Sequence, residues 1–224
     1  MSGYRIPSHA IRPATDLPMK NIVHQESNLP TEVPVMVLPQ ATLFPRALMP
    51  LYIFEPRYRQ MLRTSLNGVR MFCVAMMKPG LSEARSQDDF YHVAGLGLVR
   101  ACVHNIDGTS RLVLQGTARV TMVDFVQELP FRIARIRELR SEGLESPSVA
   151  TLAMAVIEKA RTIQRQQPEA ILDLQLDSIA EDPEAVADLV PHLLVTDPLR
   201  RQRMLEETSI EKRLAMLLED LEGK

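Results

Sequence analysis

The spacing of the prolines between Val33 and Tyr58 constrains the fold of this chain more than any other feature. Prolines stand at positions 34, 39, 45, 50 and 56. A proline inside a helix removes an amide donor and clashes with the preceding turn, so no long helix can pass through this spacing. The stretch therefore predicts short extended segments: a strand over 33–38, a turn and crossing over 41–49, and a second strand over 51–54.

Pro56 predicts the start of a helix, because a proline in the first helical turn loses no hydrogen bond. Asn67-Gly68 is a typical helix end. One face of this helix is apolar, with Tyr58, Met61, Leu62 and Leu66 at helical spacing. The other face carries Arg57, Arg59 and Arg63. These arginines are candidates for contact with a phosphate or an acidic peptide, and an ordinary charged surface is the alternative interpretation.

Short apolar segments with turn residues between them predict the rest of a sheet. A polar loop is expected over 78–89, and Gly116 is expected to divide two strands by a bulge. Gly95 and Gly97 alternate with leucines and indicate a bend or a close approach of another backbone. The further strands are expected over 70–77, 92–104, 111–115, 119–128 and 131–139. Six or seven short strands and one early helix predict a compact, partly closed sheet.

The periodicity becomes helical after Ser141. Ser146-Pro147, Asp182-Pro183 and Asp197-Pro198 are typical helix starts. Pro168 is expected to end the first helix, and a shorter helix is expected over 171–179. Pro191 is expected to kink or split the following one, and Thr208 and Glu211 fit a capping box for the last.

Together these patterns predict an α+β protein in three parts. Residues 1–32 are expected to form a flexible or loosely docked extension, 33–145 a β-rich subdomain and 146–224 a helical subdomain. The charge distribution agrees with this division, because 29–145 carries a net charge of +3 and 146–224 a net charge of −6. The overall net charge of −2 does not by itself indicate a nucleic acid or an acidic membrane as partner.

The sequence offers no secretory signal and no apolar run near the ~20 residues of a membrane helix, so a soluble cytoplasmic protein is expected. Cys73 and Cys102 lie in apolar runs and are expected to be free thiols. The phosphate-binding pattern GxxxxGK[ST], the dinucleotide pattern GxGxxG and the zinc pattern HExxH are absent. No cofactor and no catalytic group are therefore expected.

Two weaker patterns have plainer interpretations. Cys102 and His104 lie on one face of a predicted strand, but no second tight pair accompanies them, so core cysteines and surface histidines are favoured over a zinc site. Ser209 and Lys212 match the SxxK pattern of a serine nucleophile. A helix-capping serine is the favoured interpretation there, because the companion motifs SDN and KTG are missing.

Two stretches resemble a known family. The segment VMVLPQATLFPRALMPLYIFEPRYRQML resembles the start of the Lon protease N-terminal domain, as found in stand-alone LON-domain proteins. The segment LRRQRMLEETSIEKRLAMLLEDLE resembles the end of that domain. The resemblance covers about residues 30–222. It implies a β-rich subdomain similar to PUA-type barrels, followed by a helical bundle, without the ATPase and serine–lysine protease domains of full-length Lon proteases.

The resemblance implies a non-catalytic module, an adaptor or chaperone-like protein, that binds unfolded or extended polypeptide or a specific protein partner. We expect binding at an apolar groove between the subdomains and at an exposed sheet edge, bordered by 44–54 and 78–90. Arg46, Leu48 and Met49 are the expected contact residues there. Other conspicuous residues of this stretch are expected to be architectural: Phe44, Pro45, Pro50, Ile53, Phe54 and Tyr58.

The alternative is an RNA-binding protein, which requires a continuous basic face. The residues expected to form that face are Arg100, Arg111, Arg132 and Arg135. The sequence leaves the oligomeric state open, a dimer included.

Overall fold

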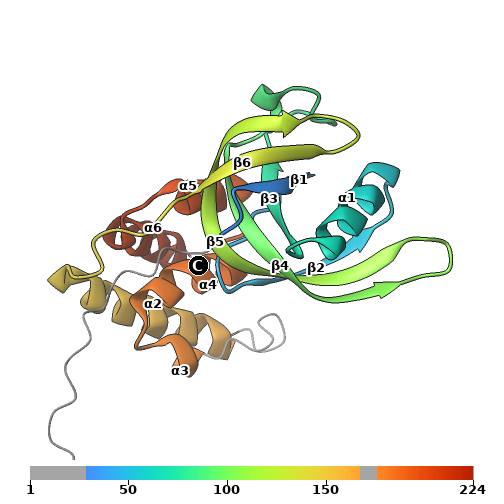
Figure 1. The fold of residues 1–224 in the computed structure, drawn as a ribbon. Helices are drawn as coiled ribbons and strands as arrows, with labels where there is room; N and C mark the ends of the chain where they lie inside the picture. The colour runs from blue at the N-terminus through green and yellow to red at the C-terminus, as the bar shows by residue number, and fades with distance from the viewer. Residues whose placement is uncertain (1–28, 167–175, 224) are drawn as a thin grey trace, which may run out of the picture.

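The computed structural model describes residues 29–166 and 176–223. Most of the predicted N-terminal extension, and the predicted helix end at Pro168, lie outside these residues. The α+β class is confirmed: a mixed sheet is followed by helices (Figure 1). None of the described helices is long and apolar enough to cross a membrane.

The sheet half consists of strands connected by loops, one α-helix and one short 3-10 turn. They are β1 (Glu32–Pro39), β2 (Leu48–Ile53), α1 (Pro56–Asn67), β3 (Met71–Met77), the 3-10 turn η1 (Gln87–Asp89), β4 (Val93–His104), β5 (Ser110–Gln127) and β6 (Arg132–Glu138). The helices that follow are α2 (Pro147–Gln166), α3 (Leu176–Ile179), α4 (Pro183–Leu194), α5 (Pro198–Glu206) and α6 (Ile210–Glu222).

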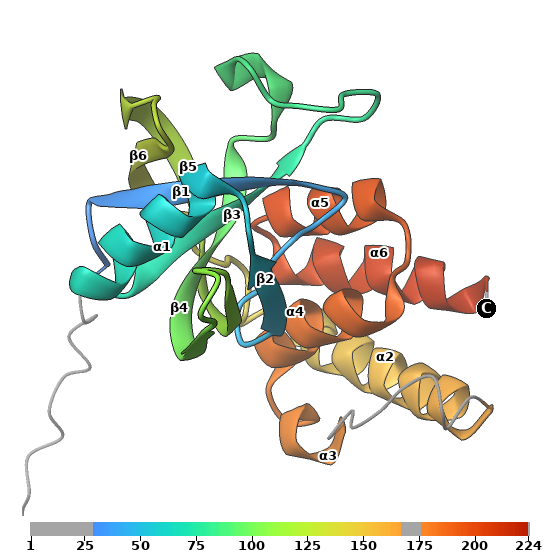
Figure 2. The same cartoon turned by 90° about the vertical axis from the view of Figure 1, so that its right-hand side faces the viewer.

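The sheet has the strand order β2-β5-β4-β3-β1-β6, with a further pairing between β5 and β6. That last pairing closes β1, β3, β4, β5 and β6 into a barrel, because the second half of β5 meets β6 while its first half carries β2. Among the strands of the described residues, β1 and β3 form the one parallel pair. Helices α2, α4, α5 and α6 gather on one side of the barrel, and α1 lies on the other (Figures 1 and 2).

Two apolar clusters stabilise this arrangement. One fills the barrel with small and branched side chains such as Val35, Ala94 and Val120. The other runs from α1 across the outer surface of the sheet and into the helices, so Phe72, Val156 and Leu214 belong to one cluster. The division into subdomains at residues 145 and 146 stays a prediction, since this second cluster spans both halves.

The structure corrects two strand predictions. β2 begins at Leu48 rather than at Leu51, and it contains Pro50. β2 is the end strand of the sheet, where a missing amide donor is tolerated. The segments predicted as two strands around Gly116 form the single strand β5, with a register shift where Gly97 pairs with Gly116. A bulge bends a strand without ending it, which explains the difference.

The helical half differs from prediction at two positions. Pro191 does not split α4, which continues to Leu194 although the proline donates no hydrogen bond to the preceding turn. The kink expected at Pro191 stays a prediction. The cap of α6 is Ser209 and not Thr208, since the Ser209 side chain accepts a hydrogen bond from the Lys212 amide. This contact gives Ser209 of the SxxK pattern a structural role.

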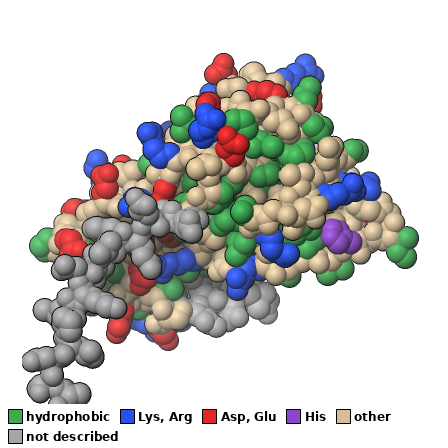
Figure 3. Space-filling model, viewed as in Figure 1, with side chains coloured by type: hydrophobic (Ala, Val, Ile, Leu, Met, Phe, Trp, Pro, Cys, Tyr) green, Lys and Arg blue, Asp and Glu red, His purple; other side chains and the backbone are tan. Residues whose placement is uncertain are grey.

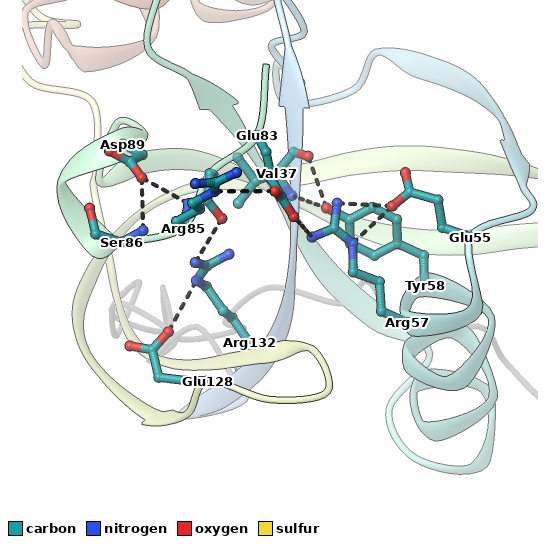
Figure 4. A network of polar contacts seen from close by, with 11 residues as sticks. Val37, Glu55, Arg57, Tyr58, Glu83, Arg85, Ser86, Asp89, Glu128 and Arg132 are labelled. Atoms are coloured by element: carbon teal, nitrogen blue, oxygen red, sulfur yellow. Dashed lines mark hydrogen bonds and ion pairs between the residues drawn. The ribbon is translucent and has the colours of Figure 1, made fainter. Parts of the chain in front are cut away.

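Tyr58 shows how α1 is fixed to the barrel. β6 pairs with β1 only as far as Val35, so the backbone of Val37 faces α1 instead of a strand. The Tyr58 hydroxyl donates to the Val37 carbonyl at 2.9 Å and accepts from the Val37 amide at 3.2 Å (Figure 4). One side chain thus takes the place of a neighbouring strand and satisfies both backbone groups.

Candidate functional site: a sheet face with two open edges

A three-stranded ribbon extends from the barrel, away from the helices (Figure 1). It consists of β2, the first half of β5 and the distal half of β4. β3 pairs with β4 only as far as Leu98. Beyond that residue, one edge of β4 has no neighbouring strand in the described part of the chain. Within the described part of the chain, no strand pairs with the far edge of β2 either. The ribbon therefore has two open edges.

The pairing register divides the ribbon into an inner and an outer face. Side chains alternate along a strand, so Leu112 and Leu114 enter the apolar cluster beneath α1 while their neighbours face outward. The outer face carries two rows of paired residues: Pro50–Val113–Ala101 and Tyr52–Arg111–Val103. Leu48, opposite Gln115, extends it along β2.

The outer face is apolar and exposed. Leu48 is 57% exposed, Tyr52 51% and Val103 64%. A shallow hollow of about 420 Å³ lies across the rows, between Pro50 and Val103. The Tyr52 ring stacks on that of Phe54 at 5.8 Å between centroids, and the Arg111 guanidinium lies 5.6 Å from the Tyr52 centroid. Contiguous exposed apolar side chains with polar neighbours are typical of an interaction surface.

The glycines explain how β2 is held in place. A Cβ atom on Gly95 would lie 1.9 Å from the Leu43 carbonyl oxygen, and one on Gly116 would lie 1.9 Å from that of Phe44. Only glycine allows the Leu43–Phe44 segment to approach the sheet so closely. Gly116 also hydrogen-bonds the backbones of Arg46 and Ala47. The close approach expected from the glycine pattern thus fixes the start of β2, and with it the outer face.

The predicted contact residues of the opening stretch are distributed over different places. Leu48 lies on the outer face. Met49 points to the opposite side and packs against the apolar cluster. Arg46 lies outside the ribbon, where its guanidinium pairs with Asp182 of α4 at 2.5 Å. Phe54, predicted as architectural, is 58% exposed.

The predicted arginines of α1 are also separated by their contacts. Arg57 pairs with Glu55 at 2.9 Å and lies 4.6 Å from the Tyr58 ring centroid (Figure 4). Arg59 lies against Gly108 in the β4–β5 turn. Arg63 is exposed one turn further along the helix. Arg59 thus lies next to the ribbon, whereas Arg57 contacts groups at the start of α1.

Sequence reasoning missed the outward-facing residues Tyr52, Val103 and Arg111 as a group. The apolar run LMPLYI was a usable signal, because positions 48, 50 and 52 must share one face if the run forms a strand. Their neighbours on β4 and β5 could not be identified without the pairing register.

A polar cavity of about 350 Å³ lies between the barrel and α4, whereas a mostly apolar hollow between the halves lies beside the predicted loop 78–90. Buried Arg119 and Asp188 line it, and Asp188 pairs with the buried Arg213. Burial raises the pKa of Asp188 to about 6, and burial together with the nearby Arg213 lowers the pKa of Arg119 to about 10. Arg119 and Arg213 also each donate a hydrogen bond to the hydroxyl of Ser141 in the connecting segment. The cavity is therefore part of the connection between the halves.

A second hollow between the halves is smaller and mostly apolar. It has a volume of about 260 Å³ and lies where the loop after β3 meets the start of α5. Its apolar lining includes Met76, Met77, Leu81, Pro198 and Leu199.

The cysteines do not meet. Cys73 lies inside the barrel, where burial raises the pKa of its thiol, and Cys102 lies on β4. Cys102 Sγ is 4.0 Å from His104 Nε2, and His104 Nδ1 is 2.8 Å from Ser110 Oγ. Within residues 29–166 and 176–223, no three His, Cys, Asp or Glu side chains are grouped to hold a metal ion.

The basic face expected for RNA binding is not continuous. Arg135 pairs with Asp124 and Glu32, at the end of β5 opposite to Arg111. Arg132 pairs with Glu128. The four predicted arginines thus fall into two separate groups.

Comparison with known proteins shows to which family the chain belongs. The family model of the ATP-dependent protease La (LON) substrate-binding domain matches residues 32–223. The chain belongs to this family. The N-terminal domain of the Mycobacterium avium complex Lon protease superposes with a TM-score of 0.69 and 13% identity, covering 85% of this chain and 98% of that one. A LON N-terminal domain protein from Xanthomonas campestris gives a TM-score of 0.59 with 20% identity, covering 84% and 98%.

Curated LON relatives are larger proteins. The chain is 28% identical over 203 residues to a Lon protease of Paraburkholderia phytofirmans, which covers 88% of this chain and 25% of that protein. Lon protease 2 of Herpetosiphon aurantiacus is 25% identical over 189 residues, covering 83% and 23%. The chain thus spans about a quarter of the length of these relatives, within the LON substrate-binding domain.

Proposed function

We propose that this LON domain is a non-catalytic module that binds extended polypeptide segments on the outer face of its ribbon. The observation that carries the proposal is the row of exposed apolar side chains, centred on Tyr52, between two open sheet edges. Extended peptides bind such places by adding backbone hydrogen bonds at an edge and by placing alternate side chains on the face. The family name describes a substrate-binding domain, which fits this role.

Pro50 limits how the segment binds along β2. It stands at the middle of a six-residue edge strand and has no amide to donate, so a peptide cannot pair with the whole edge. Side-chain contacts on the outer face must therefore contribute much of the affinity. An adaptor that presents bound polypeptide to another protein is the role that such a module would serve.

Binding of a permanently unfolded, reduced and alkylated protein tests the proposal. We expect the double substitution Leu48→Ser and Tyr52→Ser to weaken binding by at least about tenfold, since two apolar side chains contribute roughly 1.5 kcal/mol or more together. Val123→Ser is the matched control, because Val123 is 56% exposed on the barrel half of β5. Absence of binding by the unaltered protein rejects the function, and equal binding by the double variant rejects the site.

A further inference from the structure

The outer face lacks negative charge. No Asp or Glu occurs in residues 48–54, 99–104 or 110–117, which form the ribbon, whereas Arg100 and Arg111 do. In the β4–β5 turn, Asp107 accepts hydrogen bonds from the Thr109 amide at 2.9 Å and hydroxyl at 2.7 Å, which lower the pKa of its carboxyl, so the turn carries one negative charge at the end of the ribbon. In the view of Figure 3, the end of the molecule formed by this hairpin shows apolar, basic and His side chains without acidic ones.

The described basic side chains of the ribbon and of neighbouring α1 make no close ion pair, although Arg59 lies near enough to Asp107 to help lower the pKa of that carboxyl. Within the described residues, neither Arg100 nor Arg111 makes an ion pair, and the same holds for Arg59, Arg63 and Arg70. Elsewhere in the structure, arginines such as Arg135 and Arg161 each contact two carboxylates. The ribbon end is thus locally positive in a chain whose net charge is −2.

We propose that the outer face selects extended polypeptide segments in which apolar or aromatic residues alternate with Asp or Glu. This inference rests on the proposed function and names its substrate class. Apolar side chains of the segment pack on Leu48, Tyr52 and Val103. Its carboxylates meet Arg111 on the same face and Arg100 at the β4 edge. Lys-rich and Arg-rich segments are disfavoured by repulsion from the same groups.

A polypeptide fits this surface better than single-stranded RNA. Base stacking needs an aromatic ring with a free face. The Tyr52 ring is already stacked on Phe54 and lies close to Arg111. The exposed Phe54 ring belongs to the same stacked pair, and the other exposed positions, Leu48, Pro50 and Val103, are aliphatic and suit side chains of an extended peptide.

Binding of two labelled ten-residue peptides to the full chain tests the inference. Both peptides alternate Val, Leu and Phe with a charged residue, which is Glu in one and Lys in the other. We expect the Glu peptide to bind about five- to tenfold more tightly at low salt, and the difference to fall below about twofold near 1 M salt, where the screening length is only about 3 Å. Arg111→Gln should remove most of the preference, and Arg203→Gln, an exposed arginine on α5, should leave it unchanged.

The outcomes separate the inference from the proposed function. Equal binding of both peptides overturns the charge preference and leaves the polypeptide-binding function intact. Binding of neither peptide, nor of the unfolded protein, rejects both. A ten-nucleotide RNA that binds more tightly than the Glu peptide and displaces it overturns the polypeptide class. A preference that survives Arg111→Gln overturns the assigned site, and its loss in Arg203→Gln would place the preference on another face.

Discussion

Replacing Gly116 by alanine tests how β2 is fixed to the sheet. The added methyl carbon would lie 1.9 Å from the Phe44 carbonyl oxygen, which is less than any non-bonded contact allows. The methyl carbon is fixed to the Cα of residue 116 and the oxygen belongs to the Phe44 backbone, so neither can rotate away. The Leu43–Phe44 segment must move by more than 1 Å to restore an ordinary contact distance of roughly 3.2–3.4 Å.

The structure sets the size of the expected effect. Movement breaks the hydrogen bonds from the Arg46 amide to the Gly116 carbonyl, at 2.7 Å, and from the Gly116 amide to the Ala47 carbonyl, at 2.8 Å. Each contributes about 1 kcal/mol. Phe44 is fully buried, and complete loss of such a ring costs about 3–5 kcal/mol, so partial displacement costs about 2 kcal/mol. The free energy of unfolding should therefore fall by about 4 kcal/mol.

Urea unfolding at pH 7, followed by circular dichroism, measures this change. With an m-value of about 3 kcal/mol/M, the midpoint should fall by roughly 1.3 M. Gly223→Ala is the control, because that glycine has a helical φ of −78° and no atom near its Cβ position. It should change the free energy by less than about 0.5 kcal/mol. A loss below about 1 kcal/mol in Gly116→Ala would refute the reasoning, since it would mean that the Leu43–Phe44 segment is not held against β5.

Three further predictions concern buried polar groups. Tyr58→Phe should lower the free energy of unfolding by about 1–3 kcal/mol, since the Val37 amide and carbonyl lose their partner; a change near zero in urea unfolding would show that water replaces the hydroxyl. Asp188→Asn should cost about 3–5 kcal/mol because Arg213 is left buried without a counter-charge, whereas Asp177→Asn on the surface should cost less than about 1 kcal/mol in the same assay. Burial, with Arg201 nearby, lowers the pKa of His192, so the unfolded chain binds its proton more readily. His192 therefore contributes its full stabilisation to the folded state above about pH 6.5, where the histidine is neutral in both states. This contribution is lost as the pH falls below that value. The stability difference between the unaltered protein and His192→Gln should shrink from pH 8 to pH 5, and a constant difference would contradict this assignment.

Local sequence rules predicted the element order well. Prolines at positions 56, 147, 183 and 198 each begin a helix, because the first turn needs no amide donor from them. The apolar face of α1 was predicted equally well, since Tyr58, Met61 and Leu62 are all buried. These features depend on residues close together in the chain.

Features that depend on pairing between distant segments were not predictable. β5 continues through Gly116 because Gly97 of β4 and the backbone of Arg46 and Ala47 support it there. The outer face exists because Tyr52, Arg111 and Val103 meet across three strands. The sequence placed Leu48 and Met49 together as contact residues, yet adjacent residues of a strand point to opposite faces. Only the register decides which of the two is exposed.

The apolar cluster that spans the sheet and the helices has a consequence for how such a domain can change over evolution. Helix α6 contributes Leu214 and Leu217 to the same cluster that contains Phe72 of β3 and Met61 of α1. If either half were deleted, fused elsewhere or exchanged with that of a distant relative, the other would expose a wide apolar surface. The two halves must therefore be inherited as one unit, and a substitution in a helix must be accommodated by the sheet. The outer side chains of the ribbon, by contrast, lie outside this cluster, so substitutions there should affect binding more than folding.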